Sequence, residues 1–155
     1  MASRPSTTFA KLAAPAKGVG IILAGDGGQL SDTAAACDPA GSLPRAFAAA
    51  DFKGKFGSTV ELLAPSGTKL DRINVVGAGI LGDLDEHAFL RLGGLVAAQL
   101  RKATDATVVL DLPGRAVSAA EAAQFAAGIL LRAYSFDKYK TSKSEDDSKA
   151  DAPAK

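Results

Sequence analysis

The sequence is poor in the residues that most often carry chemistry or cross-links. Its 155 residues include one cysteine, one histidine and no tryptophan. The single cysteine, Cys37, excludes an internal disulfide, which fits a protein of the reducing cytoplasm. Because Cys37 and His87 are the only thiol and imidazole groups, the sequence offers no cluster of the ligands that zinc prefers. A metal site built from aspartate oxygens alone stays open at this point.

Long apolar runs and an excess of one charge are also absent. No apolar stretch reaches the roughly 18 residues that a membrane-spanning helix requires, and residues 1–8 lack the features of a secretory signal peptide. Lys and Arg number 18 and Asp and Glu 17, so the net charge is +1, which provides no overall field for nucleic acid or an anionic membrane. We therefore expect a soluble, cytoplasmic protein with no membrane partner.

The sequence has the pattern of one α/β domain. Its length favours a single domain with its own core. Short β-branched runs bounded by glycine and proline predict strands over residues 18–24, 59–64, 73–76 and 107–112. Helical spacing of apolar residues predicts a helix over residues 85–103, short helices over 31–37 and from Pro44, and a last helix from Ser118. The alternation of strand, helix and strand predicts a parallel crossover.

The last helix has the clearest signals. Ser118 and Glu121 form a capping box, in which the hydroxyl and the carboxylate each accept a hydrogen bond from a free amide of the first turn. Gly128 in the middle of the helix costs on the order of 1 kcal/mol relative to alanine, so we expect a close contact with the sheet there. The predicted apolar face consists of Ala122, Phe125, Ala126, Ile129, Leu130 and Ala133.

The main candidate for a binding site is the triplet Gly77, Gly79 and Gly82, which has the G-x-G-x-x-G spacing of a dinucleotide fingerprint. It follows a predicted strand and precedes a predicted helix. In a true fingerprint, glycines at this place allow the amides of a helix N-terminus to approach a pyrophosphate.

Two features count against a nucleotide at this triplet. Asp83 and Asp85 place carboxylates at the helix N-terminus, where a phosphate would bind. The acidic residue that binds ribose is absent at the usual spacing, and Asp111 is the best substitute. We favour a turn that is only structural over a nucleotide site.

Other candidate sites have weaker support. The loop at residues 53–59 contains Gly54-Lys55, but it lacks the next Ser or Thr of a phosphate-binding loop, and a strand follows it. Cys37 and His87 as nucleophile and base are a weak hypothesis. Aromatic and basic residues alternate after Arg132 and could stack nucleic-acid bases, although we favour a structural helix end and regard a nucleic-acid partner as unsupported. The aromatic members are Tyr134, Phe136 and Tyr139.

Residues 119–141, AAEAAQFAAGILLRAYSFDKYKT, resemble a known family. They are similar to the end of the N-terminal domain of bacterial leucyl aminopeptidases, also called cytosol aminopeptidases, where such a helix leads into an aromatic and basic segment and a charged linker. The resemblance covers roughly residues 9–143. Further matching segments are residues 9–12, 18–19, 54–58 and 72–79.

The resemblance implies a macro-domain-like mixed sheet flanked by helices. In that family a C-terminal domain supplies Lys, Asp and Glu ligands to two divalent metal ions, manganese or zinc, and no residue of this chain matches those motifs. The resemblance thus implies a non-catalytic N-terminal domain of a metal-dependent leucyl aminopeptidase, inactive alone, whose partners are its own catalytic domain and the other subunits of a hexamer.

The expected organisation follows from these points. Residues 1–8 are a flexible start, residues 9–140 the α/β domain, and residues 141–155 a disordered linker toward a missing catalytic domain. No catalytic or metal-binding residue is assigned in this chain. The alternative function is a nucleotide or ADP-ribose binding module that uses the turn at residues 77–82.

Overall fold

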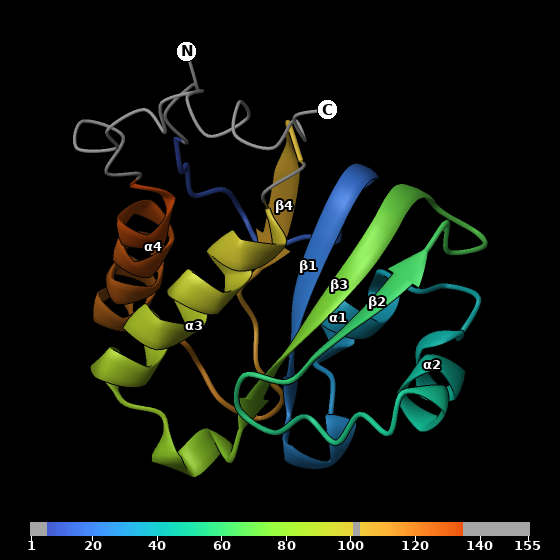
Figure 1. Ribbon diagram of the computed structural model, residues 1–155, viewed down its shortest axis with the longest axis horizontal. Helices are drawn as coiled ribbons and strands as arrows, with labels where there is room; N and C mark the ends of the chain where they lie inside the picture. Colours follow the sequence, from blue (N-terminus) through green and yellow to red (C-terminus); the bar gives the residue numbers. More distant parts are fainter. Residues whose placement is uncertain (1–5, 101–102, 135–155) are drawn as a thin grey trace, which may run out of the picture.

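The structure of the chain, a computed structural model, describes residues 6–100 and 103–134 (Figure 1). The predicted linker at residues 141–155 and most of the predicted flexible start lie outside the described residues. The elements are β1 (Lys17–Gly25), the 3₁₀ turn η1 (Asp26–Gly28), α1 (Asp32–Ala36), α2 (Leu43–Ala49), β2 (Thr59–Leu63), β3 (Lys69–Gly79), the 3₁₀ turn η2 (Leu81–Asp83), α3 (Glu86–Gln99), β4 (Ala106–Val109) and α4 (Ala119–Ala133).

The four strands form one mixed sheet in the order β2-β3-β1-β4. β1 is parallel to both β3 and β4, and β2 runs antiparallel to β3. Figure 1 shows α3 and α4 on one side of the sheet and α1 and α2 on the other. The predicted α/β domain with a mixed sheet between helices is therefore confirmed.

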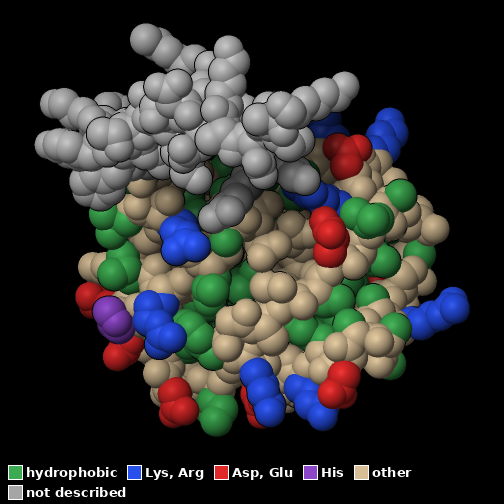
Figure 2. Space-filling model, in the orientation of Figure 1, with side chains coloured by type: hydrophobic (Ala, Val, Ile, Leu, Met, Phe, Trp, Pro, Cys, Tyr) green, Lys and Arg blue, Asp and Glu red, His purple; other side chains and the backbone are tan. Residues whose placement is uncertain are grey.

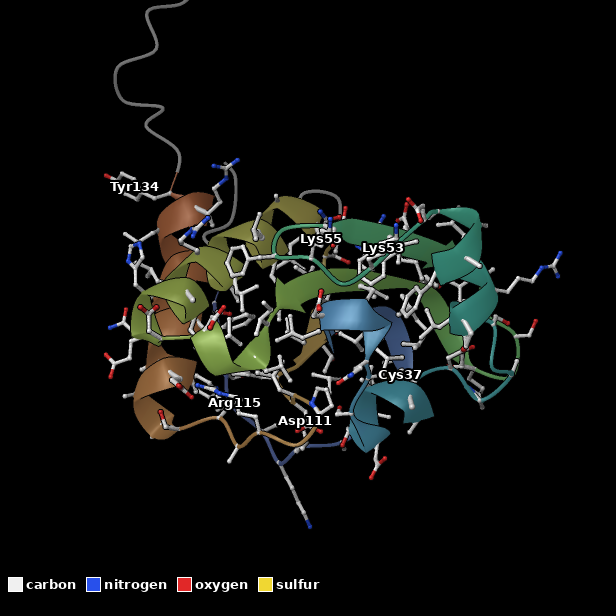
Figure 3. The ribbon with its side chains drawn as sticks, turned by 90° about the horizontal axis from the view of Figure 1, so that it is seen from below. Cys37, Lys53, Lys55, Asp111, Arg115 and Tyr134 are labelled. Carbon is white, nitrogen blue, oxygen red and sulfur yellow. The ribbon has the colours of Figure 1, made fainter. Side chains whose placement is uncertain are left out.

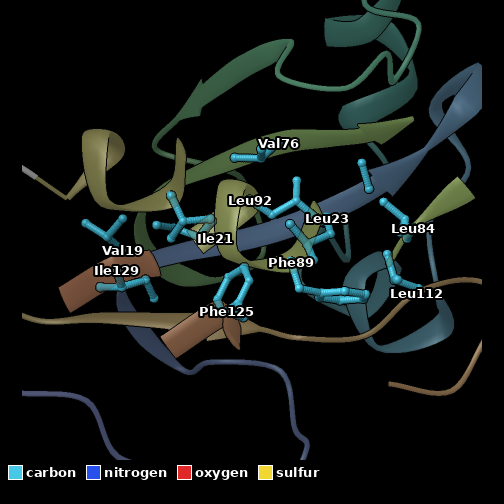
Figure 4. Close-up of a cluster of buried hydrophobic side chains, with 12 residues drawn as sticks. Val19, Ile21, Leu23, Val76, Leu84, Phe89, Leu92, Leu112, Phe125 and Ile129 are labelled. Carbon is cyan, nitrogen blue, oxygen red and sulfur yellow. The ribbon is translucent and has the colours of Figure 1, made fainter. Parts of the chain in front are cut away.

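β1 is buried on both faces and forms the centre of the core. Ile21 and Leu23 belong to the cluster under α3 and α4 (Figure 4), whereas Ile22 and Ala24 belong to the cluster under α1 and α2. Side chains of a strand alternate between its two faces. A strand covered on both faces therefore has a continuous apolar run instead of an alternating one.

Two elements end earlier than predicted. β4 ends at Val109 rather than at residue 112, because its pairing with β1 stops there, and Leu112 instead pairs with Arg115 across the turn at Pro113 and Gly114. α3 ends at Gln99 rather than at residue 103. At this end the Leu100 amide donates a hydrogen bond to the Ala97 carbonyl, which tightens the last turn.

The start of α4 is as predicted, but its buried face is narrower. The Glu121 amide donates to the Ser118 hydroxyl at 3.1 Å, and the Glu121 carboxylate accepts from the Ser118 amide at 3.0 Å, which completes the capping box. Leu130, predicted on the apolar face, is 43% exposed, and Ala133 is exposed as well. Both lie near the end of the helix, where it projects past the core.

α3 and α4 touch through glycines. A methyl group added at Gly128 would lie 2.0 Å from the Leu90 carbonyl oxygen, and one added at Gly93 would lie 2.0 Å from the Phe125 carbonyl oxygen. The predicted contact of Gly128 with the sheet is therefore wrong. Gly128 allows a close approach to the neighbouring helix, because the second backbone fills the space that a side chain would need.

We expect Gly93→Ala to lower the free energy of unfolding by about 1–3 kcal/mol, because the added methyl forces the two helices apart. Urea denaturation followed by circular dichroism measures this change. Gly94→Ala is the matched control, since its methyl meets only the Gly128 carbonyl oxygen at 4.0 Å and alanine favours the helix. Equal stabilities of the two variants would contradict the close helix contact.

Candidate functional site

The carboxyl ends of β1 and β3 lie side by side at one edge of the sheet. Ligands of α/β domains commonly bind at this edge, and the glycine triplet of the sequence lies here. Figure 3 views the molecule from below and shows Lys53 and Lys55 in one part of this end and Asp111 and Arg115 in another. We consider this edge as the candidate site.

Gly77 and Gly79 do not form the predicted turn. β3 continues through Gly79 and pairs with β1 as far as Gly25, so both glycines are strand residues. The bend comes later, at η2, which contains Gly82. The strand is longer than its apolar run because the pairing with β1 holds the glycines in place although they lack side chains.

The loop at residues 53–58 lies directly against these glycines. The Gly79 amide donates to the Gly54 carbonyl at 2.9 Å, and the Gly77 amide donates to the Ser58 carbonyl at 2.7 Å. The loop also contacts the end of β1, where the Gly27 amide donates to the Lys53 carbonyl at 2.8 Å. The amides that a phosphate would require at Gly77 and Gly79 are thus already bonded to protein carbonyls.

Two glycines are required for this loop to fit. A methyl group on Gly77 would lie 2.1 Å from the Lys55 carbonyl oxygen, and one on Gly54 would lie 1.9 Å from the Gly25 carbonyl oxygen. Gly54 also has a φ of +66°, a backbone conformation that residues with a side chain rarely adopt. Gly82, in contrast, has no atom within 4 Å of an added methyl. The close approach of the loop therefore explains why residue 77 is a glycine. No such contact requires a glycine at position 82.

The N-terminus of α3 carries carboxylates, as predicted. Asp85 is its N-cap and accepts a hydrogen bond of 2.7 Å from the Ala88 amide. Asp83 precedes it in η2, and Glu86 lies in the first turn. This negative charge disfavours a phosphate, so the nucleotide hypothesis for Gly77, Gly79 and Gly82 stays a prediction without support from the geometry.

Asp111, the substitute for the ribose-binding acid, lies away from the triplet. It lines a hollow of about 380 Å³ between the segment after η1 and the segment after β4. The hollow contains a second carboxylate, that of Asp32, but none of the three glycines. Its lining residues are Leu30, Ser31, Asp32, Thr33, Asp111, Leu112, Pro113 and Gly114.

The structure does not bring Cys37 and His87 together. Cys37 is 2% exposed in the cluster under α1 and α2, where burial raises the pKa of its thiol. A buried thiol with a raised pKa is a poor nucleophile. His87 is exposed on α3, which lies on the opposite face of the sheet. Among the described residues, no three His, Cys, Asp or Glu side chains are placed to share a metal ion.

Positive charge does not gather into a patch on the part of the surface in view. Figure 2 shows basic and acidic side chains interspersed over this face. Lys53 forms an exposed ion pair of 3.3 Å with Asp51, and Arg91 lies over the Phe56 ring at 4.7 Å. Of the predicted aromatic strip only Tyr134 is described; Phe136 and Tyr139 lie outside the described residues. Within the described ranges, no helix is long and apolar enough to cross a bilayer.

Sequence reasoning missed the structural role of Arg115. Its guanidinium donates to the Glu121 carboxylate at 2.6 Å and to the Leu84 carbonyl at 3.0 Å, and it lies over the Phe89 ring at 5.3 Å. Arg115 thus ties the start of α4 to the start of α3. The available signal was an arginine six residues before the carboxylate of a capping box.

Comparison with known proteins gives consistent matches. Residues 19–143 match the family model described as the cytosol aminopeptidase family, N-terminal domain. A probable cytosol aminopeptidase of Chelativorans sp. (strain BNC1) is 50% identical over 150 residues, which cover 97% of this chain and 30% of that protein. A probable cytosol aminopeptidase of Rhodopseudomonas palustris (strain TIE-1) is 44% identical, with 92% of this chain and 29% of that protein covered.

Among solved structures, a mutant of tomato leucine aminopeptidase shares the fold. The TM-score is 0.62 at 20% sequence identity, and the match covers 90% of this chain and 32% of the tomato chain. The chain thus spans about 30% of the length of the curated relatives that it matches.

We expect Gly77→Ala to destabilise the domain by about 1–3 kcal/mol, because its methyl displaces the loop at residues 53–58. Thermal unfolding monitored by circular dichroism measures the change. Gly82→Ala is the matched control within the same triplet, and it should leave the melting temperature nearly unchanged, since nothing lies near its methyl. An equal loss of melting temperature in both variants would indicate that the three glycines act as a unit, and it would contradict a separate role of Gly77 in making room for the loop.

A second prediction concerns pH. The Arg115 side chain and the Ser118 amide hydrogen-bond the Glu121 carboxylate and hold its pKa below the ordinary value. A lowered pKa stabilises the fold above the unfolded-state pKa, and this stability is lost as the pH falls through the folded-state pKa. We expect Glu121→Gln to be about 1 kcal/mol less stable than the unmodified chain at neutral pH, and the difference to shrink below about pH 4.

Urea denaturation at pH 7 and pH 3 tests this expectation. Glu86→Gln is the control, because Glu86 is an exposed carboxylate in the first turn of the other long helix. A difference between the Glu121→Gln variant and the unmodified chain that is the same at both pH values would contradict the role of the charged carboxylate.

Proposed function

Because this chain belongs to the cytosol aminopeptidase family, we propose that it is the non-catalytic N-terminal domain of a metal-dependent leucyl aminopeptidase. The parent enzyme removes N-terminal amino acids from peptides. The observation that most supports this proposal is the coverage, since nearly the whole chain matches relatives of which it spans about 30%. We place the catalysis in the portion of those relatives that this chain does not span.

The described side chains support this division. The carboxylates at the candidate edge lie apart from one another in two different surroundings. Asp85 caps α3, whereas Asp32 and Asp111 line an open hollow. They do not form a group of three or more potential ligands within the described ranges. We therefore place the two divalent metal ions, manganese or zinc, in the catalytic portion, where such ions activate a water molecule.

The partners of the chain follow from the same proposal. They are its own catalytic domain and the other subunits of a hexamer, in the cytoplasm. A domain that lacks the catalytic groups contributes to assembly and to the placement of the catalytic portion. The single buried thiol, Cys37, fits a reducing compartment.

We expect the purified 155-residue chain to release no p-nitroaniline from leucine p-nitroanilide above a heat-treated control, with added manganese or zinc. The full-length Chelativorans relative is the positive control. A fusion of this chain to the C-terminal portion of that relative should hydrolyse the substrate. Activity of the chain alone would overturn its non-catalytic role, and an inactive fusion beside an active relative would overturn its role as the N-terminal domain.

A further inference from the structure

The outward side of α4 is mostly apolar. The inward side contacts α3 and the core through Phe125, Gly128 and Ile129. On the opposite side, recurring at helical spacing, lies a surface that we call the outer stripe. Leu130 and Leu131 of this stripe are 43% and 66% exposed. The outer stripe consists of Ala120, Ala123, Ala127, Leu130 and Leu131.

The charges of α4 lie away from the outer stripe. Glu121 is held by Arg115, which also lies over Phe89 of α3. Arg132 is one helical turn beyond Gly128, on the side that faces α3. A surface helix ordinarily has its charged residues on the outward face, whereas a helix that is apolar nearly all round is typical of burial by further protein. The outer stripe therefore has the composition of a covered surface.

We infer that the outer stripe docks the C-terminal portion of the parent aminopeptidase, an inference that rests on the proposed function. α4 is the last described element and ends at Ala133, and the match to the family domain ends ten residues later, at residue 143. The next portion of the polypeptide is therefore tethered near Leu131, which gives it a high effective concentration at this surface.

The stripe also defines the chemistry of its partner. It contains no charged side chain, and Gln124, four residues after Ala120, adds one amide at its margin, so the partner surface is largely apolar. Ala120, Ala123 and Ala127 are small and let a helix approach closely, while Leu130 and Leu131 at the tethered end add apolar area. A second copy of this chain is the competing occupant, and the experiment below separates the two.

The test uses the fusion of this chain to the C-terminal portion of the Chelativorans relative, with a protease site between them. After cleavage, we expect the two halves to co-elute in size-exclusion chromatography. The stripe variants Ala123→Glu and Leu131→Lys should release the N-terminal half. The matched controls are Ala48→Glu on α2 and Leu63→Lys on β2, because both side chains are exposed and Leu63 is 67% exposed. Circular dichroism of each chain confirms that it is folded.

The outcomes separate the docking from the proposed function. Separation of the unmodified halves, or co-elution of both stripe variants, overturns the docking. A dimer of the chain alone that the stripe variants convert to a monomer assigns the stripe to a second copy and also overturns it. Hydrolysis of leucine p-nitroanilide by the uncleaved fusion reports on the proposed function. If the fusion is active but its halves separate after cleavage, only the docking is contradicted. If the fusion is inactive but its halves co-elute, only the proposed function is contradicted.

Discussion

Close contact between backbones at glycine is the constraint on which this fold depends. At the edge of the sheet, the loop at residues 53–58 lies against β1 and β3 because Gly54 and Gly77 have no side chain. In the helix layer, α3 and α4 meet where Gly93 and Gly128 face the carbonyl oxygens of the other helix. In both places a methyl group would displace a whole segment of backbone, and a close-packed interior has little room for that.

The kind and order of the elements could be predicted from local patterns, such as the apolar run of β1 and the capping box of Ser118 and Glu121. The contacts between segments that are distant in the sequence could not be predicted from such patterns. Gly128 was expected to face the sheet and faces α3, because the sequence indicates that a backbone needs room but not which backbone fills it. Arg115 was missed for the same reason, since two of its contacts, with Leu84 and Phe89, lie in another part of the chain.

The candidate site shows how a motif can arise from separate requirements. Gly77 makes room for a loop, Gly79 donates to that loop, and Gly82 has open space around it. The family, in contrast, was predicted from residues 119–141 and is confirmed by the match over residues 19–143. A family can be predicted from any well-matched segment, whereas a binding site depends on where several segments meet.

The position of β1 in the sheet has a consequence for synthesis of the chain. Both of its neighbours, β3 and β4, follow it in the sequence. On the ribosome β1 therefore emerges first, with apolar side chains on both faces and both edges unpaired. Unpaired apolar strands are prone to aggregate. Of the four strands, the one at the centre of the finished core is thus the strand that nascent chains expose for longest, and it is fully covered only after α4 has emerged.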